Sequence, residues 1–448
     1  MKPIYRLIFR GYRTTGGLVY WARRRFTPAG LAVVVAFFVC GAVGVDIDNT
    51  VTYQSFTLLL ALLLFSFACS FFYRATFSAS RLLPRIGTAG QPLLYRVLLK
   101  NLTAKNQTDL VLLEDLADPR PTFAEWLAFQ TAEGRRVRPF RMEDRKFRNP
   151  FSMANTKEAP IPPLPAHGEV EVRAEIFPQR RGVLRFAGVT VARPDPFGLF
   201  RSFSKVPTPQ TVLILPKRYP IPNIALPGAM RYQEGGVALA ANVGSSEEFV
   251  SLRDYRHGDP LRHIHWRSWA KTGKPIVKEY EDEFFVRHAL VLDTFDDEPN
   301  SEVLEEAVSV AASFACTILT QESLLDLLFV GNQSYCFTAG RGLAHADQML
   351  EILASVKNCA DKPFVTLENL VLNHIGAVSG CICVLQRWDD ARRKFIEKLK
   401  TLGIPLLVLI VVPAGGGISG AGGALVDAEG TLHVLEVGKI SEGLAKLK

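Results

Sequence analysis

The residues best able to support chemistry lie in one stretch, Glu247–Glu281, which has the densest collection of charged, histidine and aromatic residues in the chain. It contains His257, Asp259, His263 and His265. Imidazole and carboxylate groups are common zinc ligands, and a bound metal can activate water. His257, Asp259 and His265 could therefore form the centre of a metal-dependent hydrolase of unknown substrate.

The local pattern favours a structural interpretation of the same residues. Asp259 is a good helix N-cap, Pro260 suits the first helical position, and Gly273 suits the position after a helix end. Residues two apart on a helix point about 200° apart. His263 and His265 could not chelate one ion from such a helix, so we expect a short helix here and no zinc site.

A second candidate is the segment Asp293-Thr294-Phe295-Asp296-Asp297, which follows an apolar strand pattern. Ligands of open α/β sheets bind at the carboxyl ends of the strands. The position is similar to that of the Asp-x-Ser-x-Ser metal turn of the von Willebrand factor A fold, but Phe295 and Asp297 occupy the two serine places. Asp297 could still offer Mg²⁺ an oxygen beside Asp293. An acidic loop without metal is the favoured interpretation, so no cofactor is expected.

Familiar catalytic patterns do not occur in the sequence. There is no Gly-x-Ser-x-Gly and no His-Glu-x-x-His, and the cysteines and histidines show no catalytic pairing. We therefore expect a protein that is not an enzyme, with the metal-dependent hydrolase as the alternative.

The first elements of the chain predict a membrane anchor. Residues 26–45 and 51–73 contain no charged residue, and each is about long enough to cross ~30 Å of hydrocarbon as a helix. Residues 1–25 carry seven basic and no acidic residues, whereas the turn 46–50 is acidic. This bias predicts a basic arm at 1–25 and a two-helix transmembrane hairpin at 26–73.

The same bias predicts where the protein resides. It places the N-terminus and the main domains in the cytoplasm, on a multi-pass protein of the inner (cytoplasmic) membrane. The lipid bilayer is therefore one expected partner. The net charge of +8 arises mostly from the N-terminal arm, which gives no reason to expect a nucleic-acid partner.

Residues 80–209 read as short strands separated by turns. Val170, Val172, Ala174 and Ile176 alternate with charged residues, a period of two. We predict an antiparallel β-sandwich, immunoglobulin-like in general build. The turn Asp195-Pro196-Phe197-Gly198 is predicted to be structural. Residues 210–283 form a connector that ends in the Glu247–Glu281 stretch.

Residues 284–448 alternate apolar strands with amphipathic helices. The strand patterns are near-continuous apolar runs, as expected for a parallel sheet buried on both faces. Helices are predicted over 302–320, 343–356, 389–402 and 441–448. The chain is thus predicted to be multidomain, with an open α/β parallel sheet of the von Willebrand factor A-like kind as its last domain.

The central stretch also carries a family resemblance. The matching residues are Glu248-Phe249, Arg253-x-Tyr255, Gly258-Asp259, Arg262-x-Ile264-x-Trp266, Ala270 and Val277-Lys278-Glu279, with residues 180–200 upstream. They resemble the signature of the bacterial and archaeal membrane proteins called domain of unknown function 58. The resemblance implies work with a MoxR-type AAA+ ATPase in assembling or maturing other proteins, and implies no reaction.

The binding residues expected from this signature form one set: Arg253, Tyr255, Asp259, Arg262, Trp266, Lys278 and Glu279. Two interpretations stay open for them. They dock the partner ATPase on a membrane-anchored scaffold, or they only brace the junction between the two cytoplasmic domains. Charged pairs within the signature are expected in either case, and homo-oligomerisation stays open.

Overall fold

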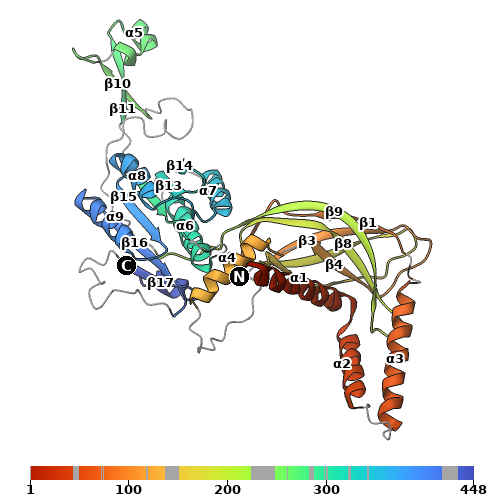
Figure 1. Cartoon of the computed structure of the whole chain (residues 1–448). Helices are drawn as coiled ribbons and strands as arrows, with labels where there is room; N and C mark the ends of the chain where they lie inside the picture. The colour runs from red at the N-terminus through yellow and green to blue at the C-terminus, as the bar shows by residue number, and fades with distance from the viewer. Residues whose placement is uncertain are drawn as a thin grey trace. The chain divides into compact units, whose positions relative to one another are not determined.

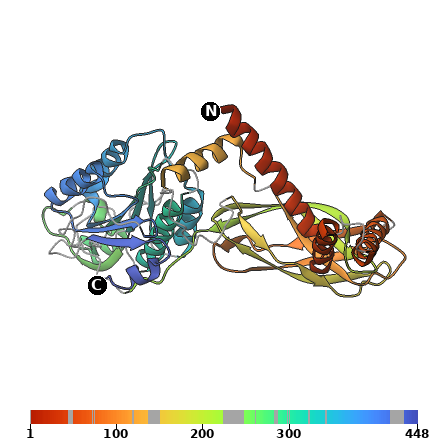
Figure 2. The same ribbon diagram turned by 60° about the horizontal axis from the view of Figure 1, so that its bottom comes forward.

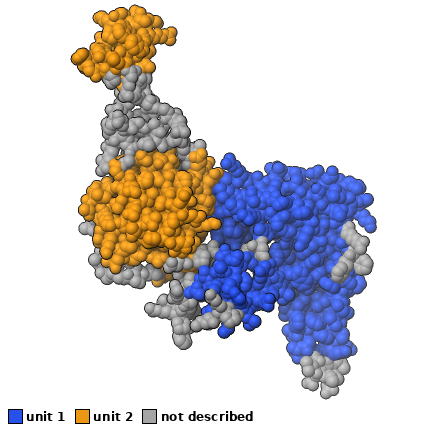
Figure 3. Space-filling view, turned by 45° about the horizontal axis from the view of Figure 1, so that its top comes forward, with its two compact units in different colours: residues 1–215 blue, residues 216–448 orange. Residues whose placement is uncertain are grey.

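The computed structural model has two compact units, residues 1–215 and 216–448, each with its own hydrophobic core (Figures 1 and 3). The structure describes residues 2–43, 50–71, 73, 75–117, 120–136, 151–222, 248–259, 261–281, 287–296, 298, 301–320, 324–340, 343–415 and 432–447. The chain is therefore a multidomain protein that mixes helices with several sheets. The finer predicted boundaries at 25, 73, 209 and 283 stay predictions.

The first unit begins with three helices, α1 (Lys2–Arg25), α2 (Pro28–Val43) and α3 (Thr50–Phe71). Among the described residues, α3 contains the single helix that is long and apolar enough to cross a membrane, Val51–Ser70, and α2 is a shorter apolar helix. α2 and α3 pack side by side, with the rings of Phe37 and Phe56 stacked at 4.7 Å (Figures 1 and 2). Length and composition alone thus support one candidate span.

A fourth helix, α4 (Phe123–Arg136), packs on α1, and the sequence did not predict it. Phe9 of α1 lies 5.4 Å from Trp126 and 5.5 Å from Phe123, between ring centroids. α4 begins with a capping box, in which Thr122 and Glu125 bond each other and the backbone. The basic arm is therefore a helix whose aromatic face is held by a second helix.

Two β-sheets complete the first unit and share one core. The first has the order β1-β3-β7-β5 and the second β2-β9-β8-β4-β6. All pairs are antiparallel except β2 with β9. The strands are β1 (Phe77–Leu82), β2 (Ile86–Thr88), β3 (Leu93–Asn101), β4 (Leu110–Leu116), β5 (Ala154–Thr156), β6 (Ala159–Ile161), β7 (Glu169–Pro178), β8 (Gly182–Pro194) and β9 (Arg201–Leu215).

The alternation in the sequence builds this core. Val172 and Ile176 of β7 are buried with Val191 of β8 and Ile214 of β9 in one cluster, while the charged residues between them point outward. A period of two leaves one face of each sheet apolar, and the two apolar faces cover each other. The predicted two-sheet arrangement is what the strands adopt.

The second unit contains a six-stranded sheet of order β14-β13-β12-β15-β16-β17. All its pairs are parallel except β13 with β14. The strands are β12 (Arg287–Leu292), β13 (Leu324–Val330), β14 (Ser334–Ala339), β15 (Gly380–Leu385), β16 (Leu406–Val412) and β17 (Leu432–Glu436). The helices are α6 (Glu302–Thr320), α7 (Leu343–Ser355), α8 (Val365–His374), η2 (Ile375–Ala377), α9 (Asp390–Thr401) and α10 (Ile440–Leu444).

Helices cover both faces of this sheet. Ala289 and Val291 of β12 share a core cluster with Val371 of α8 and Phe395 of α9. Leu290, which alternates with them, is equally buried and points to the opposite face, and α6 contacts β12. Burial on both faces explains why the strands read as continuous apolar runs.

Candidate functional site: the signature module and the sheet edge

The signature folds into a small module of two strands, one helical turn and a short helix. β10 (Glu248–Asp254) pairs antiparallel with β11 (Ile276–Glu281), and the connection holds η1 (Leu261–His263) and α5 (Trp266–Thr272) (Figure 1). Ile264 forms a β-bridge with Val277, and both side chains are buried. These two residues give the module a small apolar centre.

The core electrostatic contact of the module is between Arg253 and Asp259. Arg253 donates from Nη1 to Asp259 Oδ2 at 2.7 Å and from Nη2 to Oδ1 at 2.9 Å, and the Arg256 N–H also donates to Oδ2 at 2.8 Å. The Arg253 hydrogen bond, with the bond from Arg256, lowers the pKa of Asp259 to about 2. Gly258, with φ of +109°, allows the tight turn between them.

This contact corrects the predicted helix start. Asp259 does not cap a helix, because both of its oxygens serve Arg253 and Arg256. α5 begins only at Trp266, preceded by His265. The predicted end is confirmed, since Gly273 has φ of 69° and its N–H donates to the Trp269 carbonyl.

The described part of the module holds no cluster of histidines and carboxylates that could bind a metal. Among the described residues, no group of three or more His, Cys, Asp or Glu side chains could hold a metal ion. His265 Nδ1 instead lies 2.6 Å from Ser268 Oγ, three residues along, and His257 is exposed in the turn. This local pairing orders the first turn of α5. The geometry therefore gives the hydrolase alternative no support at His257, Asp259 and His265.

The module presents two stacked tryptophans. The rings of Trp266 and Trp269 lie 5.3 Å apart at 20°, and Trp266 is 64% exposed. Tyr255 is half-buried, and its N–H donates to Pro275 O; Lys278 is half-buried on β11. The Arg262 and Glu279 side chains lie outside the described part of the structure.

The carboxyl edge of the six-stranded sheet contains the second candidate, and its centre is an arginine. Arg392 of α9 donates from Nε to Asp293 Oδ2 at 2.7 Å and from Nη2 to Oδ1 at 3.1 Å. Its Nη1 bonds Asp389, and its guanidinium lies 4.7 Å from the Phe364 ring centroid. Burial disfavours the charge, but Asp293 and then Asp389 outweigh it and raise the pKa of Arg392.

The surroundings of Asp293 do not fit a metal ligand. Its carboxylate is completely buried, and it accepts two further bonds, from Phe295 N at 3.0 Å and Gln386 N at 3.1 Å. Four donors occupy the four acceptor positions of a carboxylate. Phe295 packs on Phe364 in the core, and Asp297 lies outside the described residues. The guanidinium of Arg392 thus supplies the positive charge at this edge.

Sequence reasoning missed Arg392 as part of this site. It lies 99 residues after Asp293, and its spacing indicates only a helix. The Asp389 end of that helix was predicted, and its side chain does accept from Arg392 N. No pattern in the sequence could have paired the arginine with the strand end.

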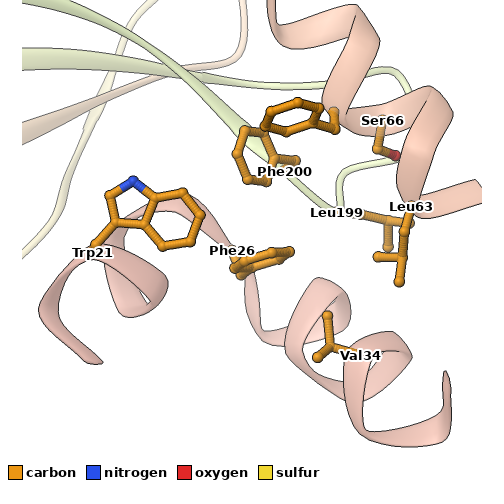
Figure 4. Close-up of a pocket in the computed structure, with 8 residues that line it drawn as sticks. Trp21, Phe26, Val34, Leu63, Ser66, Leu199 and Phe200 are labelled. Carbon is orange, nitrogen blue, oxygen red and sulfur yellow. The ribbon is translucent and has the colours of Figure 1, made fainter. Parts of the chain in front are cut away.

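A third feature is a small apolar cavity of about 120 Å³ in the first unit (Figure 4). It is lined by Trp21, Phe26, Val34, Leu63, Ser66, Phe67, Leu199 and Phe200. The turn Asp195–Gly198 supports it, because Asp195 Oδ1 accepts from Leu199 N at 2.6 Å and Phe200 N at 3.2 Å. The turn is therefore structural, as predicted, and it gathers α1, α2 and α3 at one point.

The comparisons with known proteins agree with the signature. Residues 251–377 match the family model described as "Protein of unknown function DUF58". The match confirms the resemblance to this family over residues 251–377, which are less than a third of the chain.

A curated relative and two solved structures are also similar to parts of the chain. The uncharacterized protein YeaD of Bacillus subtilis (strain 168) is 27% identical over 176 residues. The similarity spans 39% of this chain and 42% of that protein. A CARDB domain from Pyrococcus furiosus is 10% identical with a TM-score of 0.16, over 31% of this chain and 94% of that one. A cohesin module from Clostridium perfringens ATCC13124 is 10% identical with a TM-score of 0.15, over 32% and 98%. Scores this low carry no argument about the fold.

Proposed function

We propose that the protein is a membrane-anchored, non-enzymatic scaffold whose signature module docks a partner. The partner class implied by the family resemblance is a MoxR-type AAA+ ATPase acting in the assembly or maturation of other proteins. The observation that carries the proposal is the Trp266–Trp269 stack, with Trp266 64% exposed on a module that the Arg253–Asp259 ion pair helps to order. Exposed tryptophans on a preordered support are the usual centres of protein interfaces.

The same proposal covers the placement of the chain. α3 and the shorter α2 form a two-helix hairpin in the inner membrane, with the N-terminus and both main domains in the cytoplasm. The basic residues before α2 and the apolar surfaces of both helices support this arrangement. The two-sheet domain is taken as immunoglobulin-like and the open sheet as von Willebrand factor A-like, on the strand orders described above.

The bracing interpretation is the alternative within this proposal. Its basis is the place of the signature in the chain, between the residues of the β-sandwich and those of the α/β sheet. A brace would bury the tryptophans against another part of this chain, whereas a docking module keeps them available. Binding and stability experiments on the same variants separate the two interpretations.

A pull-down from membranes with the purified candidate ATPase tests the proposal. Trp266→Ala removes an exposed ring that contributes little to folding, so it should weaken binding by about 30-fold or more, as expected for an interface hot spot of at least 2 kcal/mol. Val365→Ala, on α8 and 52% exposed, is the matched control and should bind normally. Unchanged binding by Trp266→Ala would remove the docking role. A lowered melting temperature with unchanged binding would favour the brace.

A further inference from the structure

One face of α1 is apolar and uncovered. Ile4, Leu7 and Leu18 are 63%, 75% and 67% exposed, and Ile8 and Val19 are each half exposed. At 100° per residue these five side chains fall within a sector of about 120°. Gly11 and Thr15 lie in the same sector between the two apolar groups. Exposed apolar side chains gathered on one side of a helix mark an interaction site.

The rest of α1 is fixed, so the helix cannot turn to bury this stripe. Phe9 and Tyr12 pack on Trp126 of α4. At the other end, Arg24 pairs with Asp115, and the Arg25 guanidinium lies 4.3 Å from the ring centroid of Phe203. These contacts fix the rotation of α1 about its own axis, so the stripe stays exposed.

Three arginines lie on the polar side of α1: on the same helical wheel Arg10 is about 60° beyond the Leu7 edge of the stripe, and Arg6 and Arg13 are about 100° and 120° beyond it. Arg6, Arg10 and Arg13 line a surface hollow of about 430 Å³ together with Leu7 and Phe9. Within the part of the chain that the structure describes, none of the three arginines forms an ion pair with an acidic side chain. Clustered guanidinium groups without acidic partners fit phosphate groups.

The direction of α1 matches a surface position. Figures 1 and 2 show α1 lying crosswise to α2 and α3, and α1 connects directly to α2 through Phe26 and Thr27. If α2 and α3 run along the membrane normal, α1 runs along the membrane surface. A basic amphipathic helix in that position buries its apolar face about 5–10 Å into the headgroup boundary.

We infer that α1 is a membrane-surface helix that holds the first unit against anionic phospholipids. Ile4, Leu7, Ile8, Leu18 and Val19 enter the boundary between headgroups and acyl chains, and Arg6, Arg10 and Arg13 bind the phosphates. The inference rests on the membrane association proposed above and not on the docking of a partner. A protein surface or a second copy of this chain covering the stripe would be a different outcome of the test.

A photo-crosslinking experiment on the full chain tests the placement. The photoreactive residue benzoylphenylalanine replaces Leu7 or Leu18 in protein reconstituted into nanodiscs, and mass spectrometry identifies the adducts. Leu94 is the matched control, because it is 68% exposed and lies at the end of β3 that is far from α3. The near end of β3 is Asn101, which pairs with Phe77 just after α3. Phospholipid adducts should form at 7 and 18 and not at 94. Absence of lipid adducts at 7 and 18, or protein adducts alone, would overturn the inference.

Lipid charge provides the second measurement. Each basic residue near an anionic surface adds about 1 kcal/mol, or roughly fivefold in binding. The lipid adducts at position 7 should therefore favour phosphatidylglycerol over phosphatidylcholine, and the Arg6→Gln, Arg10→Gln, Arg13→Gln variant should lose that preference. Arg96→Gln, at a 60% exposed side chain of β3, should keep it. An unchanged preference in the triple variant would refute the role of the arginines.

A position inside α3 keeps the two proposals separable. Phe65 is 55% exposed within the candidate span. Lipid adducts at Phe65 without adducts at Leu7 and Leu18 would overturn only the surface helix. No lipid adducts at any of the three positions would overturn the membrane association as well.

Discussion

Removing the Arg392 side chain should lower the stability of the second unit, because Arg392 is one partner of a buried ion pair at the sheet edge. Arg392→Met keeps the length of the side chain and leaves the Asp293 carboxylate buried with only its two backbone donors. Removal of one partner from a buried ion pair costs about 3–5 kcal/mol. Because Asp293 is completely buried and the Arg392 side chain is 4% exposed, solvent cannot take over the lost contact.

Hydrogen exchange of the full chain measures this loss locally. A reduction of 3–5 kcal/mol in the opening free energy corresponds to about 150- to 5,000-fold faster exchange of amides in β12 and β15. Arg393→Met is the matched control, since Arg393 is 47% exposed and pairs with the exposed Asp390 at 3.7 Å. Such a pair contributes less than about 1 kcal/mol. Equal exchange in the two variants would refute the assignment of Arg392 as the internal counter-charge. Stabilisation of the natural protein by Mg²⁺ through Asp293 would refute it as well.

The remaining predictions concern the other sites. The Asp259 carboxylate should titrate near pH 2 by NMR, because its pKa is lowered by Arg253. The ion pair with Arg253 therefore contributes its stability above about pH 4 and loses it as the pH falls through 2. In Arg253→Gln the titration midpoint should rise toward 3.8, and an unmoved midpoint would contradict the pairing. Arg81→Met should destabilise the first unit by about 3–5 kcal/mol in denaturant unfolding, because its side chain is fully buried against Glu114 at 2.7 Å; Arg96→Met, at an exposed pair, should cost less than about 1 kcal/mol. Gly30→Ala should lower the melting temperature, because a Cβ there would lie 2.0 Å from the Leu199 carbonyl oxygen. A Cβ at Gly16 meets nothing within 4 Å, so Gly16→Ala should stabilise α1 by roughly 0.5–1 kcal/mol. Equal effects of the two substitutions would contradict the close contact of α2 with the turn.

The sequence predicts the sheets better than it predicts the sites, because the sheet pattern is local. The four strands β12, β13, β15 and β16 are buried along their whole length and read as near-continuous apolar runs, and the helix over 302–320 has the predicted bounds. The edge strand β14 was missed, because its sequence Ser334–Ala339 mixes polar and apolar residues and is only half-buried. α8 was missed because it begins with Val365 and Thr366, which have low helix propensity, and because no side chain caps its start. The Asp259 prediction was wrong for a different reason: a guanidinium six residues earlier offers the carboxylate two charged bonds, which are stronger than one bond to a helix end.

The sites depend on contacts that no short-range pattern specifies. Arg392 and Asp293 meet only because α9 begins at the carboxyl edge of β15, next to β12, which Asp293 directly follows. The exposure of Trp266 is likewise a property of the folded module, although its residue type and family position could be read in advance. The sequence therefore identified the signature as a surface of interest and could not tell which of its side chains are structural and which are available.

The backbone contact between residues 26–27 and residues 199–200 has a consequence for the biosynthesis of the first unit. Phe26 forms a β-bridge with Phe200, and Thr27 N donates to Leu199 O at 3.1 Å, across about 170 residues of chain. Translation at roughly 5–20 residues per second separates these partners by about 10–35 s. During that interval the junction between α1 and α2 has been synthesised, but the turn at 195–200 that holds it has not. A chain that ends before residue 199 therefore lacks the backbone partners of Phe26 and Thr27, and the junction between α1 and α2 is held only after the turn at 195–200 has been made.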